Sequence, residues 1–167
     1  DIEEVTPDQL RTSYEEIAGM VMGTPAAMDS VEDLVVRGGE DQDLPIRIYR
    51  PPGFVDGGPV IVYFHGGGWV IGSVDTHDEP CRAIAEATSA VVVSVDYRLA
   101  PEHPFPAAID DGFAAVCWVA RHAEDLGVDA GRLVVAGDSA GGNLSAVVSI
   151  VARDRGGPAI AFQYLIY

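Results

Sequence analysis

The stretch Arg132–Val148, RLVVAGDSAGGNLSAVV, decides how the rest of the chain is interpreted. A short apolar run ends in Gly137-Asp138-Ser139-Ala140-Gly141, and a segment rich in Ala, Val and Leu follows at once. When a strand turns directly into a helix around a G-x-S-x-G pattern, the strained turn holds the serine hydroxyl above the edge of the sheet. The stretch therefore predicts that Ser139 is an exposed catalytic nucleophile.

The residues around Ser139 fit this interpretation. Gly137 and Gly141 would let the strand and the helix pass without collision, and the N-terminus of the helix would direct free N–H groups at developing negative charge. The amide of Ala140 is thus a predicted oxyanion donor. The glycine spacing does not match a dinucleotide or P-loop pattern, since Asn143 stands where a P-loop needs lysine. A glycine-rich turn without chemistry is the structural alternative.

A second glycine-rich segment, VIVYFHGGGWVIG at residues 60–72, supplies further backbone N–H donors that the serine turn lacks. Acyl transfer builds an oxyanion that preformed backbone N–H groups stabilise by several kcal/mol. We expect Gly67 and Gly68 to donate, with Gly66 as a third candidate, and His65 to hold the loop by hydrogen bonds to its backbone. Trp69 is a candidate wall of the substrate pocket, and core packing explains an indole there equally well.

Asp138, next to the serine, is the second candidate for lining the substrate pocket. So tight a turn should nevertheless point its side chain elsewhere.

Alternating apolar and helical segments predict an α/β fold. Nearly continuous apolar runs typical of buried parallel strands cover residues 60–64, 90–95, 133–136 and 159–166. Segments with helical spacing separate them at residues 77–88, 107–126 and 140–153. We expect a mostly parallel sheet with helices on both faces, preceded by a helix from Thr6 and a hairpin at 31–36 and 44–49.

Charge and composition exclude several classes of partner. Acidic residues outnumber basic ones 26 to 10, for a formal charge of −16, which would repel nucleic acid and an anionic membrane surface. No apolar run is long enough to cross a bilayer, and no signal segment opens the chain, so we expect a cytoplasmic protein. Cys81 and Cys117 lack metal-type spacing, so we expect free thiols and no metal site.

Three motifs together resemble a known family. In this order, HGGGW, DYRLAPEHPFPA and GDSAGGN are similar to motifs of the bacterial hormone-sensitive-lipase-like esterases, family IV of the α/β-hydrolase superfamily. The resemblance runs from about Val31 to Tyr167. It implies an α/β-hydrolase core at residues 31–167, a cap segment at 1–30, and hydrolysis of short- to medium-chain carboxylic esters without a metal or organic cofactor. It also implies that the acid and the histidine follow the next two strands.

The general base is the missing part. His65, His77, His103 and His122 all precede Ser139. His65 adjoins the predicted oxyanion donors, His103 lies in a stiff proline-rich loop two strands away, and His77 and His122 are interpreted as surface or capping residues. We therefore expect the acid and the histidine to lie outside this chain, in a C-terminal part that is missing or forms a second polypeptide.

The resulting prediction is a serine carboxylesterase that forms an acyl-enzyme on Ser139, with a small-molecule ester as substrate and with this chain inactive by itself. A sheet ending at a sixth apolar strand would expose a long edge, which supports missing residues. A homo-oligomer stays open. Two alternatives stay open as well: an inactive receptor-like ligand-binding protein of the same fold, and an amidase that uses the same machinery.

Overall fold

The computed structural model describes residues 5–167, and the cap segment predicted at 1–30 therefore lies partly outside the described residues. The elements follow in the order α1 (Pro7–Val21), β1 (Ser30–Arg37), the 3-10 turn η2 (Gly39–Asp41), β2 (Asp43–Arg50), β3 (Gly58–Phe64), α2 (Asp78–Thr88), β4 (Val91–Val95), α3 (Ala107–Arg121), β5 (Val128–Asp138), α4 (Ala140–Asp154) and β6 (Phe162–Ile166).

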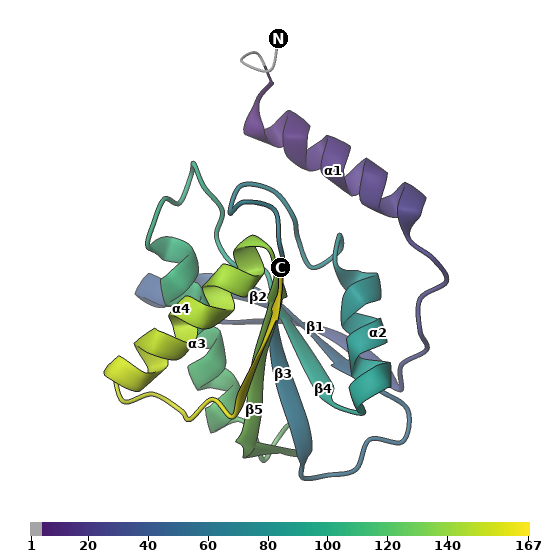
Figure 1. Ribbon diagram of the computed structural model, residues 1–167, viewed down its shortest axis with the longest axis vertical. Coiled ribbons are helices and arrows are strands. Elements are labelled where there is room, and N and C mark those ends of the chain that lie inside the picture. The colour runs from purple at the N-terminus through teal and green to yellow at the C-terminus, as the bar shows by residue number, and fades with distance from the viewer. Residues whose placement is uncertain (1–4) are drawn as a thin grey trace.

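Six strands form one sheet in the order β1-β2-β4-β3-β5-β6 (Figure 1). β1 and β2 are an antiparallel hairpin, β2 runs antiparallel to β4, and the pairs β3–β4, β3–β5 and β5–β6 are parallel. The predicted mostly parallel sheet with an N-terminal hairpin is confirmed. Since carboxyl ends of parallel strands share one edge, the loops after β3, β4 and β5 meet there.

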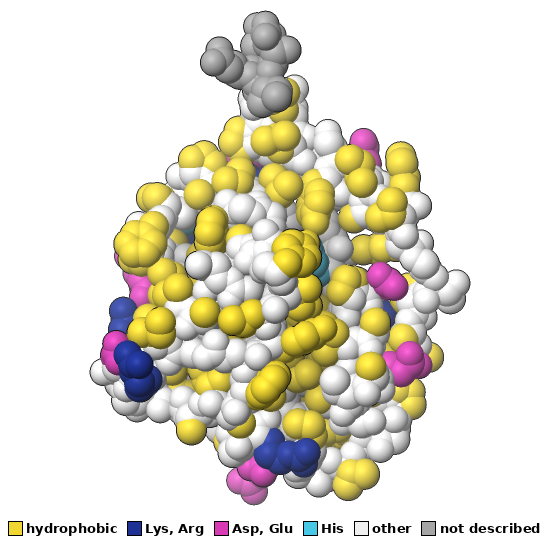
Figure 2. Space-filling view, viewed as in Figure 1, with side chains coloured by type: hydrophobic (Ala, Val, Ile, Leu, Met, Phe, Trp, Pro, Cys, Tyr) yellow, Lys and Arg dark blue, Asp and Glu magenta, His cyan; other side chains and the backbone are white. Residues whose placement is uncertain are grey.

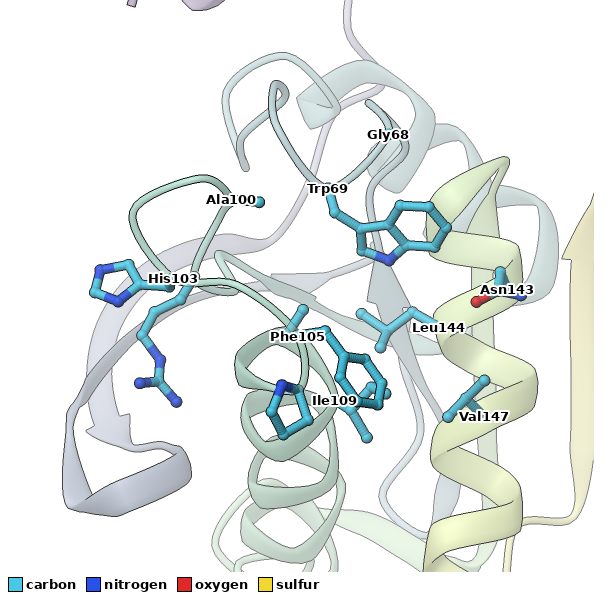
Figure 3. A pocket seen from close by; sticks show the side chains of 12 residues that line it. Gly68, Trp69, Ala100, His103, Phe105, Ile109, Asn143, Leu144 and Val147 are labelled. Atoms are coloured by element: carbon cyan, nitrogen blue, oxygen red, sulfur yellow. The ribbon is translucent and has the colours of Figure 1, made fainter. Parts of the chain in front are cut away.

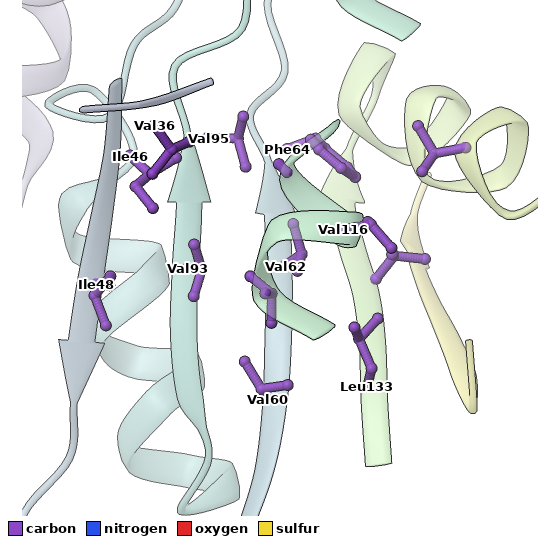
Figure 4. Close-up of a cluster of buried hydrophobic side chains, with 14 of the residues drawn as sticks. Val36, Ile46, Ile48, Val60, Val62, Phe64, Val93, Val95, Val116 and Leu133 are labelled. Carbon is purple, nitrogen blue, oxygen red and sulfur yellow. The ribbon is translucent and has the colours of Figure 1, made fainter. Parts of the chain in front are cut away.

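Strand β3 shows how the sheet separates two cores. Val60, Val62 and Phe64 face a large cluster that includes side chains of α3 and α4 (Figure 4). Ile61 and Tyr63 face a smaller cluster with α2. Side chains alternate between the two faces of a strand, so the continuous apolar run serves both cores. This two-sided burial fixes the position of the loop that follows Phe64.

The last strand differs from its prediction. The apolar run at 159–166 was expected to form a strand covered on both faces, but β6 is the outer strand of the sheet, and Phe162 and Tyr164 are 63% and 50% exposed. The face that carries β6 and α4 shows many hydrophobic and few charged side chains (Figure 2). The sequence pattern indicates how apolar a strand is, but it does not indicate which other elements pack on that strand.

Helix α1 begins as predicted and lies at the edge of the sheet that carries the loops (Figure 1). Thr6 and Gln9 form a capping box, and Pro7 occupies the first turn. Arg11 of α1 donates to the carbonyl oxygens of Val70, at 2.8 Å, and Ala100, at 3.0 Å, and it pairs with Glu102. One side chain thus joins α1 to the loops after β3 and β4.

Candidate active site

Ser139 lies between the last residue of β5 and the first residue of α4, and it is exposed. Its backbone has φ 51° and ψ −115°, a conformation that costs on the order of 1–3 kcal/mol for a residue with a side chain. A Cβ atom on Gly141 would collide with the carbonyl oxygen of Phe64, so glycine is required where the helix crosses the end of β3. The predicted strained turn with an exposed serine is present.

The direction of the Gly67 amide follows from the carbonyl of Gly66. That carbonyl oxygen accepts a hydrogen bond from Nδ1 of His65, at 2.8 Å. In a trans peptide unit the N–H group points opposite to the C=O group, so fixing the Gly66 oxygen also fixes the Gly67 N–H. Gly67 has φ 124°, which a residue with a side chain rarely adopts.

The Gly68 amide is oriented in the same way. The carbonyl oxygen of Gly67 accepts hydrogen bonds from the amides of Val70, at 3.1 Å, and Ile71, at 3.0 Å. The opposite end of that peptide unit, the Gly68 N–H, is consequently fixed as well. Within residues 5–167, neither the Gly67 nor the Gly68 amide donates to another group of the protein.

Ala140 contributes the start of α4. The first hydrogen bond of the helix runs from the Asn143 amide to the Ser139 carbonyl oxygen, at 3.0 Å. The N–H groups before Asn143 therefore have no partner within the helix, as at any helix N-terminus. Ala140 is the first residue of α4 and directly follows Ser139, so its amide is one of these free N–H groups.

His65 is fully buried, and it contacts the loop as predicted. Burial lowers the pKa of His65 to about 4, so the ring is neutral near pH 7. A carbonyl oxygen can only accept, so the proton of the neutral ring is on Nδ1, facing Gly66. The His65 carbonyl oxygen in turn accepts from the hydroxyl of Tyr97, at 2.7 Å, which anchors the start of the loop.

Two predictions change at Asp138. Its Oδ1 accepts hydrogen bonds from the Gly66 amide, at 2.9 Å, and from the Tyr63 hydroxyl, at 2.8 Å. The Gly66 amide is thus already used, which removes Gly66 from the predicted oxyanion donors. The strained turn directs the Asp138 carboxylate toward Gly66, where it supports the glycine loop (residues 65–68). It therefore does not line the apolar pocket described below.

Asp138 is ionised at neutral pH. Burial acts to raise the pKa of its carboxyl, but hydrogen bonds from His77 and Tyr63 outweigh burial and lower the pKa to about 2. The site therefore contains a permanent negative charge directly before the serine.

His77 corrects another prediction. The sequence predicts a surface or capping residue, yet His77 is only 6% exposed and makes no capping hydrogen bond to α2. Its Nε2 lies 3.4 Å from Oδ1 of Asp138. The sequence feature that could have placed His77 near the site is its position. It starts the helix after the glycine loop, at the edge of the sheet where β3 and β5 end.

An apolar pocket of about 460 Å³ lies between the glycine loop, the loop after β4, and helices α3 and α4 (Figure 3). Trp69 extends across it from the glycine loop towards α4, as predicted for a pocket wall. Asn143 and Val147 line the pocket from one face of α4, and Asn143 lies four residues after Ser139. Phe105 and Ile109 contribute on the side of α3.

No histidine hydrogen-bonds the Ser139 hydroxyl within residues 5–167. His65 holds the loop, His77 faces Asp138, and His122 contacts the Trp118 carbonyl oxygen. His103 is exposed at the pocket. Arg98 pairs with the buried Asp111 and ties the loop after β4 to α3.

Three further observations concern the described part of the chain. No group of three or more His, Cys, Asp or Glu side chains there could hold a metal ion. Its two cysteines are free. None of its helices combines the length and the hydropathy needed to cross a membrane.

Comparisons with known proteins agree with this geometry. Residues 61–167 match the model of a family described as alpha/beta hydrolase fold. Carboxylesterase NlhH of Mycobacterium tuberculosis is 59% identical over 125 residues, which cover 75% of this chain and 39% of that protein. The ethyl acetate hydrolase of Pseudomonas putida is 39% identical over 163 residues, covering 96% of this chain and 51% of that protein.

Among solved structures, an esterase of Pyrobaculum calidifontis superposes with a TM-score of 0.92 and 47% identity, covering 97% of this chain and 52% of that chain. The chain thus spans about half the length of the relatives it matches, or less. The three motifs, the sheet order and these matches show that the chain belongs to the α/β-hydrolase fold family, in its hormone-sensitive-lipase-like group.

Proposed function

We propose that the protein containing this chain hydrolyses carboxylic esters through an acyl-enzyme on Ser139. One observation carries the proposal: the exposed serine lies at the start of α4, beside a loop whose two unpaired amides have directions fixed by their own peptide units. Such an arrangement stabilises an oxyanion without reorganisation during the reaction. The similarity to carboxylesterase NlhH and to the esterase of Pyrobaculum calidifontis supports the same chemistry.

The reaction has two halves. Oγ of Ser139 loses its proton to a base and attacks the ester carbonyl carbon, and the amides of Gly67, Gly68 and Ala140 hold the resulting oxyanion. The intermediate collapses, the C–O bond breaks, and the alcohol leaves with the proton from the base. Water then attacks the acyl-enzyme by the same steps, which releases the carboxylic acid and restores the serine hydroxyl.

We infer that the base, and the carboxylate that orients it, come from outside these 167 residues. The two buried histidines near the site, His65 and His77, already contact Gly66 and Asp138. His103 belongs to the loop after β4, two strands from β5, and strands are spaced about 4.8 Å apart. The share of the relatives that this chain covers leaves room for further residues.

The apolar pocket supports a short- to medium-chain substrate. Its volume of about 460 Å³ is in the range of small-molecule sites, and its walls are mostly apolar. Because the wall of the pocket on α4 begins at Asn143, four residues after Ser139, an acyl or alkyl chain in it would place the ester carbonyl near the hydroxyl. Helix α1, joined to both neighbouring loops by Arg11, is the part of the predicted cap that we expect to limit access.

The test uses the full-length protein with p-nitrophenyl butyrate, the matching anilide, and a fluorophosphonate probe. We expect ester turnover, labelling of Ser139, and loss of both in Ser139→Ala. Faster cleavage of the anilide than of the ester would identify an amidase. Absence of both turnover and labelling in a folded protein would contradict the proposal and favour a ligand-binding protein.

A further inference from the structure

A buried polar cluster lies behind the glycine loop, and the proposed chemistry leaves part of it unexplained. His77 packs among aromatic rings, with its centroid 5.5 Å from that of His65, 6.3 Å from that of Tyr63 and 6.4 Å from that of Tyr14. These rings come from the loop after β3, from β3 and from α1. Burying an imidazole among them is costly unless its nitrogens have partners.

Both ring nitrogens of His77 have partners, and the partners determine where a proton must be. Nε2 faces Oδ1 of Asp138 at 3.4 Å, and an ionised carboxylate can only accept, so Nε2 carries a hydrogen. Nδ1 lies 2.9 Å from Oγ1 of Thr76, whose hydroxyl can donate or accept. The Thr76 hydroxyl is also within reach of the Ser73 carbonyl oxygen, at 3.0 Å, so it can donate to either neighbour.

The contact continues from Asp138 to the oxyanion loop. The same Oδ1 that faces His77 accepts the Gly66 amide, and the Gly66 carbonyl determines the direction of the Gly67 amide. Rotation of the Asp138 carboxylate would release Gly66 and loosen the donors beyond it. Asp138 also places a negative charge beside the serine, where it opposes a forming oxyanion. A hydrogen-bond donor on the opposite side of Asp138 would hold the carboxylate against rotation and would offset part of its negative charge.

We propose that His77 is a positioning residue of the oxyanion loop: its Nε2–H group fixes the Asp138 carboxylate, which fixes Gly66 and thereby the Gly67 donor. The proposal rests on the proposed ester hydrolysis. His77 does not touch the reacting atoms, so its effect on the oxyanion donors should stabilise the transition state and appear in kcat. It does not line the apolar pocket, so substrate binding there should not depend on it.

Kinetics of the full-length protein with p-nitrophenyl butyrate provide the first test. Removing a donor from an oxyanion hole costs about 100- to 1,000-fold in kcat, and loosening one through Asp138 should cost less, about 10- to 100-fold. We expect this loss for His77→Phe, with KM changed less than about twofold. Gln can present an N–H near the position of Nε2, so His77→Gln should recover most of the activity. His122→Phe, which removes a histidine stacked on Trp118, is the control and should retain full kcat.

Equal losses in His77→Phe and His77→Gln, or a change confined to KM, would overturn the proposal. Because His77→Phe can fail to fold, a second measurement uses the unmodified protein. In ¹⁵N spectra of the histidine rings, we expect Nε2 of His77 to be protonated and the Gly66 amide to exchange slowly. An unprotonated Nε2 would refute the contact with Asp138. If the protein turns over no ester but these spectra are as expected, the proposed function fails and the support of the loop by His77 stands.

Discussion

Two neighbouring regions of the molecule form the candidate site in opposite ways. The glycine loop at residues 65–68 is held by polar side chains, with the buried His65 and Tyr97 and the partly buried Asp138 each hydrogen-bonded to its backbone. The apolar pocket beside it is lined by side chains with few polar contacts, and Trp69 and Phe105 are 40% and 84% exposed. The backbone amides that we propose as oxyanion donors are fixed from behind, whereas the side chains that we propose to contact substrate are exposed.

This contrast predicts which changes alter catalysis and which alter substrate preference. Substitutions in or behind the glycine loop should reduce kcat for every ester. Substitutions in the pocket should change the ranking of esters.

Gly67→Ala should have the largest effect. A Cβ atom there would collide with the Ile71 carbonyl oxygen, and φ 124° is unfavourable for alanine. We expect kcat for p-nitrophenyl butyrate to fall about 100- to 1,000-fold, comparable to the loss of an oxyanion donor. Gly53→Ala is the matched control, because Gly53 also has positive φ (72°) but open space around it. A kcat for Gly67→Ala close to that of the control would contradict the assignment of Gly67.

Asp138→Asn tests the support behind the loop through stability and pH. The folded pKa of Asp138, about 2, lies below the usual value, so its ionisation stabilises the fold above the unfolded pKa, and that stabilisation is lost as pH falls towards 2. A shift of this size corresponds to roughly 2 kcal/mol. Denaturant unfolding should show the full difference between wild type and Asp138→Asn at pH 6 and a smaller difference at pH 3. A difference that does not vary with pH would contradict this linkage.

Trp69→Ala tests the pocket. The indole extends across the pocket towards α4, so removing it should enlarge the space for long chains (Figure 3). Loss of the contacts of one methylene group costs about 1 kcal/mol of binding free energy, which corresponds to a several-fold change in kcat/KM. We expect the preference between p-nitrophenyl butyrate and octanoate to shift about 10-fold towards octanoate, with kcat for butyrate nearly unchanged. An equal reduction for both esters would assign Trp69 to the loop instead.

Arg11→Ala should have the smallest effect. Its ion pair with Glu102 is partly exposed, and solvent screens such pairs, so the pair itself should contribute little. The two backbone carbonyl contacts of Arg11 add to this, so α1 should detach more often while the sheet stays folded. Limited proteolysis should show faster cleavage between residues 22 and 29 than in Arg153→Ala, which removes an exposed pair within α4. Equal cleavage rates would show that α1 does not depend on Arg11.

The sequence predicted the parts that depend on local pattern. The strained turn at Ser139 follows from small residues between a strand and a helix, and β3 and β4 follow from runs of branched apolar residues. The exposed edge of β6 was predicted, but the exposure of its faces could not be, because that depends on what packs on the strand and not on its own residues.

The support of the glycine loop was predicted only in part. His65 adjoins the loop in sequence, so its role was visible. Tyr97 follows β4 and reaches the loop only through the order of the strands, whereas His77 ends the same connection as the loop and acts through Asp138 at the end of β5. The orientation of the Asp138 carboxylate, which uses the Gly66 amide, depends on a backbone angle that the sequence does not specify.

The most direct measurement is a crystal structure of the full-length protein after reaction with a fluorophosphonate. The phosphonyl oxygen of that adduct stands in for the oxyanion. Our account predicts a bond from phosphorus to Oγ of Ser139 and a phosphonyl oxygen about 2.7–3.1 Å from the amide nitrogens of Gly67, Gly68 and Ala140. A phosphonyl oxygen directed away from these amides, or phosphorus on another residue, would contradict it.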